Sequence, residues 1–296
     1  IRMIEFLRQV SVTCFFTSYL VVLVLESFRL LGRVPGRGLA VLVMTSIGLL
    51  THATYLLLRA TATDLGQESG RLATWTDWSL MLALGLAVAF LFFYVRRPDT
   101  IVSFFFLPAV MALIGLAVAV RNQPAFDRTE ATEFWRNVHA FSMMVGSATV
   151  LVGFLAGVMY LTQSWRLKRK RAGSSFRLPT LETLQNLNRR CLVASTAAVG
   201  VGFLSGVVMN WNRWGEVGGT DSGIILSAVL FVWLASATTV EFLYAPASRG
   251  RKVAYLTLAS FGFLVLAMTG LLASSHGQTK ETPPVESAAG TGVFRI

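Results

Sequence analysis

The fold is decided by residues 138–163, which read VHAFSMMVGSATVLVGFLAGVMYLTQ and contain no Lys, Arg, Asp or Glu. About twenty predominantly apolar residues are enough to cross a bilayer as an α-helix. The stretch is followed almost at once by the basic run 166–171, RLKRKR, and basic residues next to an apolar run are typical of the cytoplasmic end of a span. The sequence here predicts a membrane-spanning helix and not the core helix of a soluble domain.

Seven further apolar runs of similar length flank this one. The chain has 296 residues, of which 54% are hydrophobic and only 14% charged, whereas a soluble domain has roughly 25% charged residues. This composition excludes a soluble enzyme, a secreted disulfide scaffold and a disordered chain. The two cysteines form neither C-x-x-C nor C-x-x-C-H, which excludes a thiol oxidoreductase and a c-type cytochrome. The eight expected spans lie near 10–31, 38–60, 76–95, 101–120, 138–163, 191–210, 223–245 and 253–273.

The loop charges predict the orientation of the chain. Sixteen of the 26 Lys and Arg residues lie in one set of loops, together with only four acids, among them Glu26. Because basic loops stay in the cytoplasm, we expect an all-α, polytopic, eight-helix bundle with both termini on the outer side. Residues 1–275 are expected to form one transmembrane domain, and residues 276–296 an outer tail.

A leucine-rich segment follows the basic run. Leu178, Leu181, Leu184 and Leu187 recur at helical spacing with polar residues between them. This predicts a short amphipathic helix near 179–189 that lies on the cytoplasmic membrane surface. The neighbouring basic loops are expected to contact anionic lipids and not nucleic acid, since they adjoin span ends.

Three histidines are the most informative polar residues, because ionisable groups near a bilayer are costly and usually functional. In the expected topology His52, His139 and His276 all lie toward the outer side. So do five of the seven tryptophans, with Trp211 and Trp214 expected in a short outer loop.

An aromatic surface of this kind can stack on a flat ligand. Arg136 and Arg213, which lie beside these residues in the sequence, can pair with carboxylates. Two imidazoles, an aromatic surface and cations for propionates are what a haem site at a membrane surface requires. Histidines that only cap helix ends, in a belt of interfacial tryptophans, remain the alternative.

Several segments resemble one family. The stretch from His139 through Gly153, Gly157 and Tyr160 into the basic loop resembles the His-to-Tyr-Leu span of CcsA/HemX-like cytochrome c assembly proteins. Residues 178–184, LPTLETL, and 187–190, LNRR, are similar to that family's cytoplasmic connector. Residues 52–56, HATYL, are similar to its early intramembrane histidine segment.

This resemblance implies a haem-handling protein of system II cytochrome c maturation, with several spans in the bacterial inner (cytoplasmic) membrane. Haem b would be held at the outer face between His139 and His276, below a tryptophan-rich loop, while His52 matches the family's histidine inside the membrane. The partners would be a membrane protein of the cytochrome c synthetase and apocytochrome c. The chain would thus be one component of a haem lyase and not a stand-alone soluble enzyme.

Two segments differ from the family pattern. The family's loop runs W-G-x-x-W-x-W-D-P-K-E-x-W, whereas residues 211–223 read WNRWGEVGGTDSG. The family's second intramembrane histidine falls on Glu241 when Trp233-Leu234 is aligned with its Trp-Leu pair, and a carboxylate does not replace imidazole as a low-spin haem ligand. We expect Glu241 to pair with Arg249 or to reach water near the helix end.

These differences leave two other functions open. The chain would then be a membrane subunit of a larger electron-transfer complex. It would either keep a bis-histidine haem b permanently or serve as a haem-free structural subunit.

Overall fold

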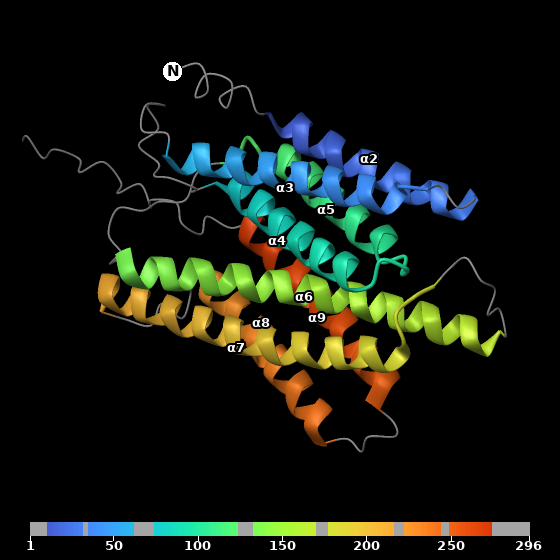
Figure 1. The fold of residues 1–296 in the computed structure, drawn as a ribbon. Helices are drawn as coiled ribbons and strands as arrows, with labels where there is room; N and C mark the ends of the chain where they lie inside the picture. Colours follow the sequence, from blue (N-terminus) through green and yellow to red (C-terminus); the bar gives the residue numbers. More distant parts are fainter. Residues whose placement is uncertain are drawn as a thin grey trace, which may run out of the picture.

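The protein is described from a computed structural model, which covers residues 11–31, 35–61, 74–123, 133–169, 177–215, 222–243 and 249–273. Within these ranges every regular element is an α-helix (Figure 1). The helices are α2 (Val12–Leu31), α3 (Arg37–Thr61), α4 (Trp75–Arg96), α5 (Ser103–Ala119), α6 (Glu133–Lys168), α7 (Leu181–Trp214), α8 (Ser222–Leu243) and α9 (Arg249–Ala273).

Seven of these eight helices are long and apolar enough to cross a membrane. The eighth, α5, has 17 residues, which is the lower end of the range of roughly 17–25 for a spanning helix. Pro108 lies inside α5 without interrupting it. The prediction of an all-α, polytopic membrane protein is therefore confirmed.

The helices form two groups of four, α2–α5 and α6–α9 (Figure 1). Within each group neighbouring helices pack side by side, and α6 and α7 make the most extensive pairing in the molecule. The two groups meet where α4 and α5 pack against α6. This arrangement matters for the site, because helices of the two groups pack against each other only along that junction among the described residues.

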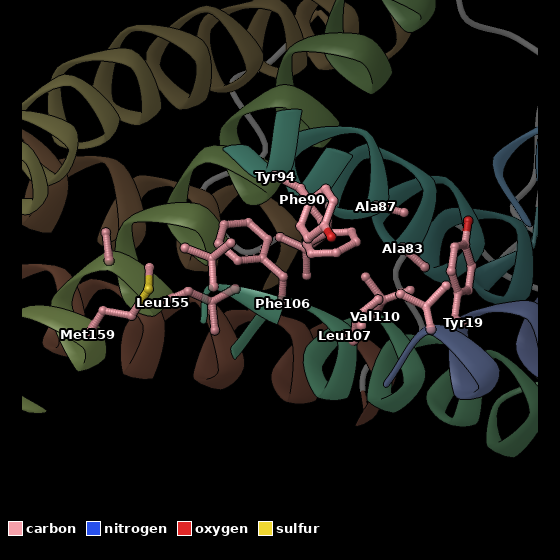
Figure 2. Close-up of a cluster of buried hydrophobic side chains, with 14 of the residues drawn as sticks. Tyr19, Ala83, Ala87, Phe90, Tyr94, Phe106, Leu107, Val110, Leu155 and Met159 are labelled. Atoms are coloured by element: carbon pink, nitrogen blue, oxygen red, sulfur yellow. The ribbon is translucent and has the colours of Figure 1, made fainter. Parts of the chain in front are cut away.

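A continuous apolar core crosses the junction. Figure 2 shows its side chains from Tyr19 of α2, past Phe90 of α4 and Phe106 of α5, to Leu155 and Met159 of α6. Tyr19, Phe90 and Phe106 are fully buried. Because lipid tails are as apolar as these side chains, the groups are held together by close packing and not by escape from water.

Small residues permit the close approach of α6 and α9. A Cβ atom added to Gly157 would lie 2.7 Å from both Thr257 Oγ1 and Leu258 Cδ1, and 3.1 Å from the Ala254 carbonyl oxygen. One turn earlier on α6, Phe154 stacks on Phe261 with ring centroids 4.1 Å apart. The Gly153-x-x-x-Gly157 step thus lets the α9 backbone approach α6 directly.

The predicted amphipathic helix near 179–189 is wrong as a separate surface element, because these residues are the first turns of α7. Thr180 caps the helix by accepting a hydrogen bond from the Thr183 amide (3.3 Å), and α7 continues unbroken to Trp214. Leu184 and Asn188 are buried in the bundle. No Gly or Pro lies between the polar first turns of α7 and the apolar turns that follow, so the helix continues through both. It ends at Gly215, whose φ is +69°.

Candidate functional site

One end of the bundle is rich in tryptophan. It holds the starts of α4 and α6 and the end of α7 (Figure 1), and we call it the tryptophan-rich end. Trp75, Trp78 and Trp135 are half-buried there, whereas Trp211 is 56% exposed. The expectation that Trp211 and Trp214 lie in a loop is wrong, because both belong to the last turn of α7.

His139 lies near the start of α6 and faces α7. Its Nδ1 atom is 2.7 Å from the carbonyl oxygen of Gly202. A Cβ atom added to Gly206 would lie 3.1 Å from Nδ1 and 3.2 Å from Cε1 of the same ring, and one added to Gly202 would lie 2.7 Å from Met143 Sδ. The missing side chain at Gly206 provides the space for the imidazole, and the missing side chain at Gly202 provides space for Met143. The ring can therefore reach the Gly202 carbonyl oxygen.

This hydrogen bond determines the tautomer of His139. A carbonyl oxygen only accepts, so Nδ1 carries the proton and donates, and the lone pair of the neutral ring is on Nε2. A hydrogen bond from Nδ1–H to a backbone carbonyl is how proteins orient a metal-ligating histidine. In this tautomer Nε2 is the ring nitrogen that bears the lone pair.

Other predicted residues share the helix face of His139. Trp135 and Arg136 lie four and three residues before it on α6, so they project beside it. Trp135 is half-buried and packs edge-on against Phe134, with ring centroids 5.2 Å apart. Arg136 is also half-buried. The side chains of Arg213 and Trp214 and the whole of His276 lie outside the described residues.

His52 is enclosed in the other group of helices. Its side chain is fully buried in α3 and stacks on Phe15 of α2, with parallel rings 4.1 Å apart. The Tyr19 hydroxyl lies 3.4 Å from Nδ1. The Nε2 atom makes no well-formed hydrogen bond among the described residues, although the Leu80 backbone lies within its reach. The ring is thus held by an aromatic stack and by a neighbouring hydroxyl, in the way that proteins orient an intramembrane imidazole.

The structure does not bring His52 and His139 together. They lie on α3 and α6, and within the described part of the chain these two helices make no contact with each other. A site that uses His139 is therefore separate from one that uses His52.

An ion pair that the sequence analysis missed lies close to His52. Arg59 Nε of α3 is 2.6 Å from Asp77 Oδ1 of α4. Arg59 also donates to the Tyr55 hydroxyl (3.4 Å), and the Tyr55 ring packs on Phe15. Asp77 forms a capping box with Thr74, and the T-x-x-D pattern in the sequence was the signal that could have placed it at a helix start.

A second buried acid was misassigned to a loop. Glu26 lies inside α2 and is fully buried. Arg37 Nη1 donates to its Oε1 (2.8 Å) and Ser103 Oγ donates to its Oε2 (2.8 Å), so this carboxylate connects α2, α3 and α5. Glu241 at the end of α8 is only 3% exposed. The expectation that its side chain reaches water is therefore wrong.

The fold and these histidines define a class: a polytopic helical membrane protein with oriented imidazoles inside the bundle and at one of its ends. The chain belongs to the cytochrome C assembly protein family, whose model matches residues 72–278. It is 24% identical over 227 residues to the cytochrome c biogenesis protein CcsA of Pyropia yezoensis, a match that covers 63% of this chain and 70% of the relative. It is 27% identical over 219 residues to an uncharacterized 28.8 kDa protein from the nifR3-like 5' region of Azospirillum brasilense, covering 70% and 77%.

Membership of this family supports a role in cytochrome c biogenesis. The family is associated with haem handling, and it implies membrane partners and apocytochrome c in general. The predicted identification as a cytochrome c assembly protein is therefore confirmed. The assignment of particular residues to haem is a further step, and it rests on the geometry described above.

Proposed function

We propose that the protein holds haem b at the tryptophan-rich end, with His139 and His276 as axial ligands, and presents it for attachment to apocytochrome c. The observation that carries this proposal is the 2.7 Å hydrogen bond from His139 Nδ1 to the Gly202 carbonyl. It places the proton on Nδ1 and the lone pair of the neutral imidazole on Nε2, the nitrogen through which His139 would hold a haem iron. When bound, haem would supply the iron centre that these two imidazoles hold.

The register of α9 against α6 supports the pairing of His276 with His139. Phe154 stacks on Phe261, and His139 lies 15 residues before Phe154 while Ala273 lies 12 residues after Phe261. At about 1.5 Å per helical residue, α9 ends roughly one turn short of the level of His139. The three residues from Ala273 to His276 can span about 10 Å, which is enough to cover that difference.

The surrounding side chains suit a porphyrin. Trp211 and Trp214 end α7, the helix that also provides Gly202, and we assign to them the stacking on or shielding of the macrocycle. Arg136, one turn before His139, and Arg213 are assigned to the two propionates. Trp135 adds aromatic surface next to the ligand.

His52 provides a separate imidazole within the membrane. Its fully buried position inside the bundle, where ionisable groups are usually functional, supports a role as a haem ligand of its own. Since α3 does not contact α6 among the described residues, this role is independent of the outer site. When Trp233-Leu234 is aligned with the family's Trp-Leu pair, the matching histidine falls on Glu241.

The orientation of the chain in the membrane, its partner protein and its lipid contacts belong to the same proposal. The basic ends of the helices face the cytoplasm by the positive-inside rule, so that the tryptophan-rich end faces outward, and the membrane is the bacterial inner membrane. The partner is a second membrane protein of the cytochrome c synthetase. Anionic lipids meet the basic loops.

The test is the haem content and absorption spectrum of the protein purified in detergent. We expect a low-spin Soret band in the wild type and a loss of about tenfold or more in His139→Ala and in His276→Ala. Asn137→Ala, which changes an exposed residue two positions from His139, is the control and should keep the band. Each variant must elute as a monodisperse peak in size-exclusion chromatography, which shows that a loss of haem does not result from unfolding.

The other functions are outcomes of the same experiment. Haem that passes from the protein to an apocytochrome c peptide supports the proposal. Haem that stays bound and is reduced by a quinol would identify an electron carrier, and a wild type without haem would identify a structural subunit. His52→Phe should keep the Soret band of the haem at the tryptophan-rich end. It should lower only the amount of a second haem per chain. An unchanged total haem content would mean that His52 is not a haem ligand.

A further inference from the structure

A cavity of about 380 Å³ lies between the two groups of helices, far from the tryptophan-rich end. It is lined by the end of α4, the segment that connects α4 to α5, Met159 of α6 and the first turns of α7. Its volume is far above the roughly 10–15 Å³ that one buried water needs. Within the described part of the chain α4 does not pack against α7, so the cavity separates these two helices.

Three arginines, Arg96, Arg97 and Arg190, line the cavity, and we call it the arginine cleft. All three are exposed, and no acidic side chain is among the described residues that line the cleft. The Arg96 guanidinium lies over the Phe92 ring at 4.0 Å, which keeps its charge beside an apolar wall. The cleft thus combines a cluster of positive charge with aromatic and aliphatic surface.

The depth of the cleft matches the level of lipid headgroups. Arg96 is the last residue of α4, whereas α6 and α7 continue beyond that level (Figure 1). Phe92, one turn inside, is 49% exposed on the side of the apolar span. The charged side chains therefore lie where the hydrocarbon of the bilayer ends, and the aromatic ones where it begins.

One wall of the cleft is fixed by hydrogen bonds from both groups. The Ile101 amide donates to the Arg177 carbonyl (3.0 Å), which attaches the α4–α5 segment to the residues before α7. Arg29 of α2 donates to the Thr100 carbonyl (3.0 Å) and also to the Asp99 carbonyl. The cleft is thus a formed site and not a gap next to a loose loop.

We propose that the arginine cleft binds the headgroup of an anionic phospholipid, whose phosphate pairs with the three arginines and whose chains lie along Phe92 and its neighbours. Basic pockets between transmembrane helices are recognised sites for acidic headgroups. Guanidinium groups suit phosphate because they donate two parallel hydrogen bonds. The bound lipid would fill the space between α4 and α7 and so join the two groups of helices, independently of any haem.

The test uses the whole protein after lipid depletion in detergent, with thermal unfolding and native mass spectrometry as readouts. We expect phosphatidylglycerol to raise the unfolding temperature and to be retained at one molecule per chain. Phosphatidylcholine and inorganic phosphate at the same concentration should do neither. The triple variant Arg96→Gln, Arg97→Gln, Arg190→Gln should bind on the order of 100-fold more weakly, because each basic residue near a headgroup contributes about fivefold.

The matched control removes the same charge outside the cleft. Lys168→Gln, Arg169→Gln and Arg251→Gln change three exposed residues that do not line the cavity, and this triple variant should bind phosphatidylglycerol as the wild type does. Asn186→Trp, at an exposed position of the lining, fills the cleft but keeps every arginine and should abolish retention.

Three results would overturn the proposal. The first is equal loss of lipid in the two triple variants, which would mean a general effect of surface charge. The second is equal stabilisation by phosphatidylcholine or by inorganic phosphate alone. The third is full retention of phosphatidylglycerol in Asn186→Trp. If the triple variant of the cleft is not monodisperse, the lipid titrations of the wild type and the lipid retention of Asn186→Trp test the proposal instead.

Discussion

Arg59 and Asp77 face each other where α3 ends and α4 begins, with Nε and Oδ1 2.6 Å apart. The Asp77 side chain is 3% exposed and that of Arg59 is 36% exposed. The pair therefore joins two neighbouring helices next to the packed rings of Tyr55, Phe15 and His52.

Replacing this buried carboxylate should destabilise the protein. Asp77→Asn keeps an oxygen for the Thr74 cap but removes the partner of Arg59, and we expect a loss of about 1–2 kcal/mol, since one partner is partly screened by solvent. Thermal or denaturant unfolding in detergent measures it. Asp99→Asn, an exposed acid between α4 and α5, is the control, and an equal effect there would show that the pair contributes nothing specific.

Gly206 should be needed for the position of His139. A methyl group at residue 206 would lie 3.1 Å from His139 Nδ1, so Gly206→Ala should displace the ring and weaken its hydrogen bond to Gly202. We expect haem retention to fall about tenfold while the helix content stays unchanged. Absorption per protein together with circular dichroism is the measurement.

The control for this variant is Gly262→Ala in α9, where an added Cβ meets no atom within 4 Å. Alanine is the better helix former at such a site, so this variant should keep its haem and be no less stable. Similar haem loss in both variants would mean that Gly206 has no particular relation to His139.

Glu26 and Arg37 should be energetically coupled. Removing either partner leaves the other charge buried or half-buried, so Glu26→Leu should cost about 3 kcal/mol of unfolding free energy. The double variant Glu26→Leu, Arg37→Leu should cost less than the sum of the single variants, with a coupling energy of about 1–3 kcal/mol. Denaturant unfolding of the four proteins measures the cycle. Simple additivity would contradict the pairing.

Gly157 should tolerate no side chain. In Gly157→Ala the new methyl group meets a backbone carbonyl at 3.1 Å as well as two side chains of α9, and we expect a loss of about 1–3 kcal/mol from forced separation of α6 and α9. Gly115→Ala in α5, where nothing lies within 4 Å, should be neutral or slightly stabilising. Thermal unfolding compares the two, and equal stability would refute the close approach.

The helices were predictable because length and hydropathy alone mark a span. Each of the eight apolar runs overlaps one helix, even α5 with its internal Pro108. The ends of α6 and α7 were less predictable, since hydropathy falls where polar side chains begin although the backbone continues to propagate the helix. For α7 this moved Trp211 from a predicted loop into a helical turn.

The site was predictable only in its residue types. His139 could be assigned to the end of the bundle, but its hydrogen bond to Gly202 depends on the register of α6 against α7, which hydropathy does not specify. Similarly, Glu26 was counted among loop charges, because its partners Arg37 and Ser103 come from other helices. Pairings across helices therefore needed the structure.

The 36 residues of α6 make it about 54 Å long, whereas the hydrocarbon of a bilayer is about 30 Å thick. Tilt alone would have to reach about 55° to bury that length, beyond the usual limit of about 40°. The ends of α6 must therefore extend beyond the hydrocarbon, and one of these ends bears Arg166 and Lys168. A protein that docks on that side would therefore meet an ordered, basic helix end at the headgroup level.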